Sequence, residues 1–402
     1  MINTYIPGTV PGKPSSILPP GSPQPAATPK PLAPKENELP RAINYQADYS
    51  GCGYWRMSWP EQTLTSYQHM IVHGLTCMVR DKAFYSNLKS VRLQRQANPA
   101  QLNFYKMLRG YADEMNFRLI YEIDDVVMRE DIPDYNKYKF AFEPDEIRNC
   151  VLEMMRMSDE ISVTNAYMRD YYADKTGNNN ITVIPNYPPR FWLDRYYDEE
   201  LISRNYDRHV KKRKQPRILY AGSGAHFDVD NKVNQLDDFA HVRDVVRKTC
   251  NKYKWVFVGA YPPPLHDLVK SGKIEFHQWL SLYDLPNLIS KLKINCMVAP
   301  LIDNNFNRCK SDIKYVEACA YGIPVVCQDM ITYQNALHKF RTGDDMIDQI
   351  NTIVSDKQQY MKTCRKMRQN IETRWLENPD NIGKYKELYC TSYGSSERKY
   401  LK

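Results

Sequence analysis

The segment 307–326, NRCKSDIKYVEACAYGIPVV, places charged side chains on a helical pattern that is otherwise apolar. Ser311 is the expected N-cap of this helix. Lys310, Lys314 and Glu317 are spaced by four and three residues, which places them on one arc of the helix. A helix N-terminus beside two ammonium groups favours a phosphate, and a carboxylate one turn further on can accept hydrogen bonds from ribose or sugar hydroxyls. An amphipathic helix with an ordinary Lys/Glu pair is the alternative.

A glycine-rich turn follows a hydrophobic strand in the segment 218–231, ILYAGSGAHFDVDN. Glycines at such a turn let backbone amides approach a diphosphate closely, whereas a plain tight turn is the other interpretation. The residues expected to contact a diphosphate here are Gly222, Ser223 and Gly224.

The same segment continues with His226 and two aspartates. His226 is a candidate for contact with a reacting sugar or hydroxyl. Asp228 and Asp230 have the D-x-D form of a metal site, but aspartates here equally suit a helix cap, so we expect no metal.

The N-terminal half carries two further candidates. Gly51 and Gly53 lie in the first strand-to-helix loop, where they would face the later glycine turn, although a structural glycine turn is equally expected. Asp124 and Asp125 end the strand RLIYEIDDVV, at the edge where ligands of parallel sheets bind. Adjacent residues of a strand point to opposite faces, so we expect at most one of them to enter a cleft, as a base, a hydroxyl ligand or a cap.

Short β-rich runs alternate with longer helical patterns along the chain, which predicts parallel α/β sheets. Helices are expected over, for example, 60–72 and 99–116. The predicted strands are 42–46, 76–79, 91–94, 118–127, 160–163 and 181–185, then 217–221, 254–259, 274–279, 294–300 and 323–327. We therefore expect two doubly wound, Rossmann-like domains facing a central cleft.

The domain boundaries are predicted from breaks in this alternation. A proline-rich start and a charged stretch ending in RHVKKRKQPR interrupt it. The expected parts are a disordered tail over 1–38, a first α/β domain over 39–190, a basic linker over 191–215, a second α/β domain over 216–375 and a helical segment over 376–402 that can cross back to the first domain.

Bulk composition narrows the class of protein. The formal net charge of +8 is a modest excess, and the ten cysteines are scattered without a C-x-x-C pair, which predicts reduced thiols. No run of about 18 apolar residues and no signal-peptide pattern occurs, so we expect a soluble, cytoplasmic protein.

Three stretches together resemble the donor-binding half of retaining GT-B glycosyltransferases of the family 4 type. They are the glycine turn, FHQWLSLYDLPNLIS at 276–290 and KSDIKYVEACAYGIPVV. In that family the glutamate in the context E-A-x-A-x-G-x-P-V-V binds the nucleotide ribose, and Glu317 matches it. The family's earlier glutamate of the E-x7-E pair corresponds to Cys309, and the Lys-Gly after its glycine turn is missing.

The resemblance implies a transferase that uses a nucleotide sugar, expected to be UDP-linked, and needs no metal. The second domain would hold the donor, with Glu317 on the ribose, Lys310 and Lys314 with the glycine-turn amides on the diphosphate, and Gln278 and Trp279 near the base. Asp124, Asp125 and His226 would contact the acceptor or the sugar, and front-face attack by the acceptor hydroxyl is the expected route.

The acceptor is predicted from a shorter likeness. The residues SGCG at 50–53 with Glu61 and Gln62 are similar to the N-terminal glycine loop of phage DNA hexosyltransferases, which glycosylate 5-hydroxymethylcytosine. The leading acceptor is therefore double-stranded DNA with hydroxymethylated bases, and the target base would be flipped out to reach the cleft. For a phage-encoded enzyme, this reaction would take place in the cytoplasm of the bacterial host. A surface polysaccharide or lipopolysaccharide acceptor, or a non-catalytic nucleic-acid-binding protein that uses the basic run Lys211 to Lys214, are the alternatives.

Overall fold

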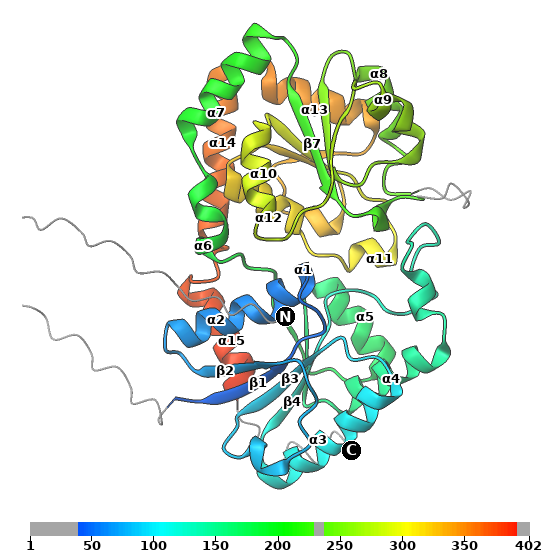
Figure 1. The fold of residues 1–402 in the computed structure, drawn as a ribbon, viewed down its shortest axis with the longest axis vertical. Helices are drawn as coiled ribbons and strands as arrows, with labels where there is room; N and C mark the ends of the chain where they lie inside the picture. The colour runs from blue at the N-terminus through cyan, green and yellow to red at the C-terminus, as the bar shows by residue number, and fades with distance from the viewer. Residues whose placement is uncertain (1–38, 229–236, 392–402) are drawn as a thin grey trace, which may run out of the picture.

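The computed structural model describes residues 39–228 and 237–391 as two α/β domains stacked along the long axis (Figure 1). The proline-rich tail over 1–38, Asp230 of the D-x-D pattern and the last residues of the 376–402 segment lie outside these ranges. Each domain contains a six-stranded sheet in which all described pairings are parallel, with helices packed around it. The predicted fold class of two doubly wound domains is confirmed.

The N-terminal sheet has the strand order β2-β1-β3-β4-β5-β6. Its strands are β1 (Arg41–Tyr45), β2 (Ile71–Leu75), β3 (Ser90–Gln94), β4 (Arg118–Glu122), β5 (Glu160–Val163) and β6 (Ile181–Val183). Its helices are α1 (Gly51–Gly53), α2 (Trp59–Ser66), α3 (Pro99–Met115), α4 (Asp145–Met157) and α5 (Ala166–Thr176). Helix α3 shows how local sequence sets the bounds, because Asn98 and Gln101 form a capping box at its start and Asn116 adopts the left-handed conformation at its end.

The C-terminal sheet has the strand order β12-β11-β10-β7-β8-β9. Its strands are β7 (Arg217–Gly222), β8 (Lys254–Gly259), β9 (Glu275–His277), β10 (Cys296–Ala299), β11 (Val325–Gln328) and β12 (His338–Phe340). Its main helices are α8 (Arg243–Thr249), α9 (His266–Lys270), α10 (Leu285–Leu292), α11 (Asn305–Arg308), α12 (Ile313–Tyr321), α13 (Gly343–Ser355) and α14 (Lys357–Glu372).

Two sequence expectations fail at the edges of the sheets. The strand predicted over 76–79 is wrong, and the edge strand is β2 at 71–75, which overlaps the end of the predicted helix 60–72. Helix α2 ends at Ser66 because the chain turns at Gln68, whose φ is 57°. Strand β12 was not predicted, because three residues are too few to show an alternating pattern.

Helices also occupy the segment predicted as a basic linker. Residues 191–215 contain most of α6 (Arg190–Leu193), then α7 (Glu199–Tyr206) and a π-helical continuation, Asp207–Lys212. Trp192 of α6 packs on Trp55 and Trp59 of the N-terminal domain. Helix α7 and its continuation pack on the C-terminal domain, where the Tyr206 hydroxyl donates to the Val354 carbonyl at 2.8 Å.

The last described helix, α15 (Pro379–Cys390), lies against the N-terminal sheet, whose strands are distant from it in sequence (Figure 1). The Tyr389 hydroxyl donates to Asn44 at 2.8 Å, and Arg118 donates to the Leu388 carbonyl at 2.9 Å. The chain therefore crosses between the domains twice.

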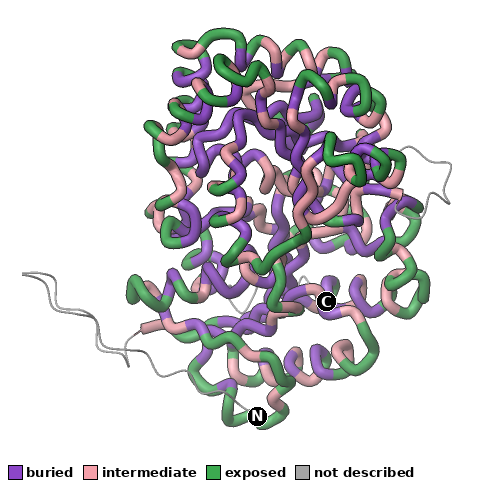
Figure 2. Tube along the Cα trace, turned by 45° about the horizontal axis from the view of Figure 1, so that its top comes forward, coloured by how far each residue is buried: buried purple, intermediate pink, exposed green. Residues whose placement is uncertain are grey.

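Buried segments run through the centre of each domain, and the exposed ones lie on the outer helices and loops (Figure 2). One apolar cluster spans both domains, since it joins Trp55 and Trp192 to Leu219 and Trp375. No helix in the described ranges is both long enough and apolar enough to cross a bilayer.

Candidate functional site

A cavity of about 190 Å³ lies between the two domains, at the carboxyl ends of both sheets. It is lined from the N-terminal side by Gly51, Cys52, Trp55, Arg95, Asp124, Asp125 and Asn186, and from the C-terminal side by His226, Leu301, Lys310, Ser311, Ile313, Lys314 and Tyr333. Seven of the candidates from sequence therefore meet at one place, which is where parallel sheets bind ligands: Gly51, Asp124, Asp125, His226, Lys310, Ser311 and Lys314.

The start of helix α12 differs from the expectation by one residue. Its N-cap is Asp312 and not Ser311, and Arg374 holds the Asp312 carboxylate through two hydrogen bonds of 2.9 and 3.0 Å. Ser311 is thereby left to face the cavity, where its hydroxyl accepts a hydrogen bond from Asn186 of the other domain at 3.0 Å. The expected cap fails because an ion pair fixes the following aspartate in place.

Lys314 and Glu317 lie one turn apart on α12 and perturb each other. Burial lowers the pKa of Lys314, and the charge of Glu317 opposes that shift. Burial likewise raises the pKa of Glu317, against the charge of Lys314. The Lys314 ammonium also sits 5.4 Å from the centre of the Tyr220 ring. A negative ligand would relieve the cost of keeping this lysine charged.

His226 follows the glycine turn and is held by a buried carboxylate. Its Nδ1 lies 2.7 Å from Asp238, a residue that also accepts from Tyr135 and Asn307 and from the Ile302 N–H. Burial of Asp238 would raise its pKa, but these hydrogen bonds outweigh burial and lower it. The carboxylate therefore accepts the proton of Nδ1, which leaves Nε2 as the acceptor nitrogen.

The His226 ring is neutral at physiological pH. Burial and the nearby Lys314 charge lower its pKa to about 4, although Asp238 opposes the shift. No hydrogen bond to Nε2 occurs among the residues that the structure describes, and the ring lines the cavity. A neutral imidazole held in this tautomer can accept a proton or a hydrogen bond from a hydroxyl.

Both Asp124 and Asp125 line the cavity, against the expectation that at most one would. Strand β4 already ends at Glu122, so the two aspartates lie in a loop and do not alternate across the sheet. Asp124 accepts from Arg95 Nε, and Asp125 lies 3.7 Å from the Lys310 ammonium across the domain boundary.

The other predicted residues lie outside the cavity lining. These are Gly53, Gly222, Ser223, Gly224, Gln278, Trp279 and Glu317. Gly222 and Gly259 are paired in the sheet, and a Cβ at Gly259 would stand 2.5 Å from the Gly222 carbonyl and 2.6 Å from the Trp279 ring. Trp279 is 51% exposed, so the loop after β9 presents an aromatic face near the glycine turn.

The surroundings of Cys309 account for a cysteine, and not a glutamate, at this position. It is fully buried in the apolar cluster of the N-terminal domain together with Phe306, although both belong to the C-terminal half of the sequence. Asn165 donates to the carbonyls of Arg308, Cys309 and Lys310 at 2.9 to 3.3 Å. A glutamate at 309 would have to bury its charge against apolar side chains.

Three functional candidates were missed from sequence, namely Arg95, Asp238 and Asn186. Arg95 directly follows strand β3, as Asp124 follows β4, and its φ of 47° is in the left-handed region that non-glycine residues seldom adopt. Position after a predicted strand was the available signal for Arg95. Neither Asn186 nor Asp238 gave a signal, since only the tertiary fold brings Asn186 to the cavity and Asp238 to His226. Within the described ranges, no three His, Cys, Asp or Glu side chains gather as a metal-ligand set.

No protein-family model and no curated protein matches this sequence. Among solved structures, the chain is similar to a mutant of S. aureus TarM in complex with Fondaparinux, alpha-GlcNAc-glycerol and UDP, with 13% identity and a TM-score of 0.49. That match covers 75% of this chain and 55% of the other, so this chain spans about half of that structure's length.

Two further matches cover more of both chains. A UDP-glucosyltransferase from Polygonum tinctorium has 8% identity and a TM-score of 0.45, with 87% of this chain and 97% of that chain covered. The wall teichoic acid polymerase TagF has 13% identity and a TM-score of 0.39, with 92% and 91% covered. Because these three identities are 13% or lower and the TM-scores 0.49 or lower, nothing about this chain's activity is inferred from them.

Proposed function

We propose that this protein is a glycosyltransferase that moves a sugar from a nucleotide donor, UDP-linked, to a hydroxyl acceptor. The observation that carries the proposal is the cavity itself, where Lys310 and Lys314 of one domain face Asp124 and Asp125 of the other beside a neutral His226. Cations on one wall suit a diphosphate leaving group, and the groups opposite suit a hydroxyl nucleophile.

The cavity is smaller than the roughly 300 to 1,000 Å³ typical of pockets that enclose a whole ligand. It would take the sugar and diphosphate end of the donor, with the ribose on Glu317 and the base over Trp279 outside it. Lys310, Lys314 and the amides of the turn 222–224 would stabilise the diphosphate as the glycosidic bond breaks and negative charge gathers on it.

The acceptor side is proposed from Asp124, Asp125 and His226. A hydroxyl entering between the domains would meet the Nε2 of His226, the acceptor nitrogen of the ring. We propose a hydroxymethylated pyrimidine base of double-stranded DNA as this acceptor, flipped out of the helix to reach the cavity. The short likeness at 50–53 supports this choice over a glycan acceptor.

Turnover of UDP-sugars on hydroxymethylcytosine DNA, compared with unmodified DNA, tests the proposal. We expect sugar transfer to the modified DNA alone. Inactivity on both together with intact UDP binding would direct the search to a surface glycan acceptor. A wild-type protein that binds no nucleotide would overturn the enzyme assignment.

The variant Glu317→Ala separates the enzyme from a silent nucleic-acid-binding protein. We expect it to lose UDP binding, measured by calorimetry, while DNA binding stays intact. Glu317→Gln is the matched control, because it keeps the side-chain volume and one carbonyl acceptor for a ribose hydroxyl.

A further inference from the structure

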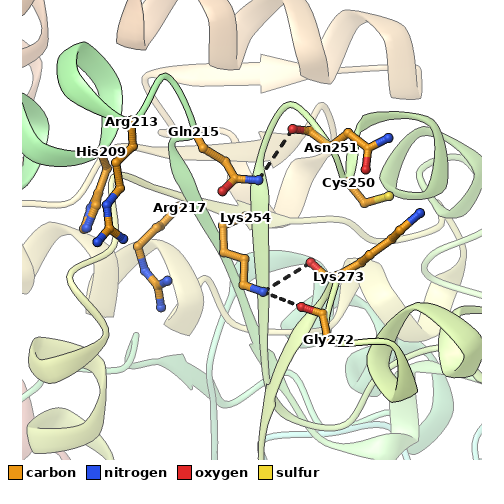
Figure 3. Close-up of a pocket in the computed structure, with 9 residues that line it drawn as sticks. All are labelled: His209, Arg213, Gln215, Arg217, Cys250, Asn251, Lys254, Gly272 and Lys273. Atoms are coloured by element: carbon orange, nitrogen blue, oxygen red, sulfur yellow. Dashed lines mark hydrogen bonds between the residues drawn. The ribbon is translucent and has the colours of Figure 1, made fainter.

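A second recess lies at the opposite end of the C-terminal sheet from the cavity. It has a volume of about 320 Å³ and is lined by His209, Arg213, Gln215, Arg217, Cys250, Asn251, Lys254, Gly272 and Lys273 (Figure 3). Arg217 and Lys254 begin strands β7 and β8, whereas the cavity lies at the ends of those strands, about 17 Å away along a six-residue strand.

The cations of this recess are not neutralised by carboxylates. Among the described residues, Arg217 alone of the four lining cations has an acidic partner, Glu275 at 2.9 Å. The Lys254 ammonium donates to the carbonyls of Gly272 and Lys273, at 2.7 and 3.4 Å (Figure 3). Carbonyl groups carry no net charge, so they do not neutralise the ammonium. Arg213 and Lys273 are exposed.

A buried histidine with one unpaired ring nitrogen supports a ligand at this place. His209 is only 4% exposed, and its Nδ1 has no hydrogen-bond partner among the described residues. Burial, followed by the charges of the nearby Arg217 and Arg213 guanidinium groups, lowers the pKa of its ring to about 4 (Figure 3). An anion would offset these charges, whereas a purely structural cluster would supply a carboxylate.

A neighbouring hollow of about 540 Å³ shares Arg213 with the recess and is also lined by Arg204, Asp207, Arg208 and Lys212. The one acid there, Asp207, is already paired with Lys357 and lies 3.7 Å from Lys211. Five lining cations of the two hollows have no acidic partner among the described residues, and we call them the basic band: Arg208, Lys212, Arg213, Lys254 and Lys273. A π-helical turn, Asp207–Lys212, presents its first part, and such turns occur often at functional sites.

We propose that the basic band binds the phosphodiester backbone of a nucleic acid, as a contact separate from the donor cavity. A row of like charges fits a polyanion better than a single phosphate, and arginine suits phosphate oxygens geometrically. A membrane surface fits less well, because interfacial anchors combine basic with large apolar side chains, and none of the exposed large apolar residues in the described ranges lies in 204–217 or 248–273.

The contact carries no base recognition and does not rest on the proposed activity. Backbone contacts position a protein on nucleic acid without reading its sequence, so the band would act as a tether. Failure of one proposal therefore leaves the other testable, because nucleotide binding reports the cavity and nucleic-acid binding reports the band.

Binding of a labelled, unmodified DNA duplex, followed by fluorescence anisotropy across a salt series, tests the band. We expect the full-length variant R213Q/K254Q/K273Q to bind at least tenfold more weakly than wild type, with the slope of log K against log salt reduced by about 2 to 3, since each lost phosphate contact removes about 0.9. UDP binding should not change.

The matched control replaces three exposed lysines elsewhere, Lys106, Lys362 and Lys366, by glutamine. It should keep the wild-type affinity and slope. The double variant R213Q/K273Q leaves the hydrogen bonds of Lys254 intact, so it guards against misfolding and should still reduce the slope.

Three outcomes would overturn the proposal. One is equal affinity and slope in the triple variant and wild type, and another is a wild type that binds no duplex even at low salt. The third is band-dependent binding to phosphatidylserine vesicles or to inorganic pyrophosphate without duplex binding, which would assign the band to lipid headgroups or free phosphates.

Discussion

The two ends of strand β7 treat positive charge in opposite ways. At the carboxyl end every cation of the cavity stands near a carboxylate: Lys310 near Asp125, Arg95 beside Asp124, and Lys314 within reach of Glu317. At the amino end, three of the four cations of the recess have no such partner in the described part of the chain.

The pairing of the cations indicates which kind of ligand each end of the strand can bind. Paired and half-buried charges are held in fixed positions, which suits one ligand in one orientation and a reaction. Cations without a carboxylate partner keep their positive charge available at the surface, which suits an extended polyanion whose binding is driven by release of counterions.

The largest effect is expected from Asp238→Asn, which removes the carboxylate that fixes the His226 tautomer. Sugar-transfer turnover should fall by about 10² to 10⁴, the usual contribution of a positioned acid or base. UDP affinity should stay within about threefold, because Asp238 does not line the cavity.

Tyr135→Phe is the matched control for Asp238→Asn. It removes one hydrogen bond to the same carboxylate, 2.9 Å long, and keeps the His226 contact. A comparable loss of turnover in both variants would show that Asp238 acts by holding the domains together and not through His226.

Next in size is Lys314→Gln, which removes a cation proposed to contact the diphosphate. UDP should bind about 10- to 100-fold more weakly by calorimetry, in line with hydrogen bonds to charged groups. Lys314→Arg keeps the charge and should recover most of the affinity. An unchanged affinity for UDP in Lys314→Gln would remove this lysine from the donor site.

The pH dependence of UDP binding should be smaller still, at most tenfold per pH unit. Burial holds the pKa of free Lys314 below its ordinary 10.5, and a bound diphosphate would raise it again. UDP binding therefore takes up protons, and affinity should fall as pH rises through the lowered pKa of the free lysine. Calorimetry in buffers of different ionisation enthalpy measures this uptake, which the Lys314→Arg variant should lack.

The smallest effect is expected from Arg213→Gln on stability. Exposed residues without a partner usually change the free energy of unfolding by less than about 0.5 kcal/mol. By contrast, Arg374→Gln breaks the paired, largely buried contact with Asp312 and should cost about 2 kcal/mol. Urea denaturation compares the two, and a large loss in Arg213→Gln would mean that the basic band is structural.

The main helices and strands could be predicted from sequence because hydrophobic periodicity and helix caps depend on residues close together in the chain. Strands β5 and β8 were predicted with their observed bounds, 160–163 and 254–259. The failures are short edge strands, and an N-cap decided by Arg374, a residue 62 positions away from Asp312. Long-range pairing overrides local preference in such places.

The two α/β domains and the charged residues at the strand ends could be predicted from local patterns, because strand and helix periods repeat along the chain. Only the tertiary structure decided which of these residues meet. Domain packing buries Cys309 in the apolar core of the N-terminal domain. The fold also brings His226 into contact with Asp238 and forms the recess lined by His209, Arg213, Gln215 and Arg217. Side chains far apart in sequence carry no local signal of their contact, so their pairing depends on how the domains pack.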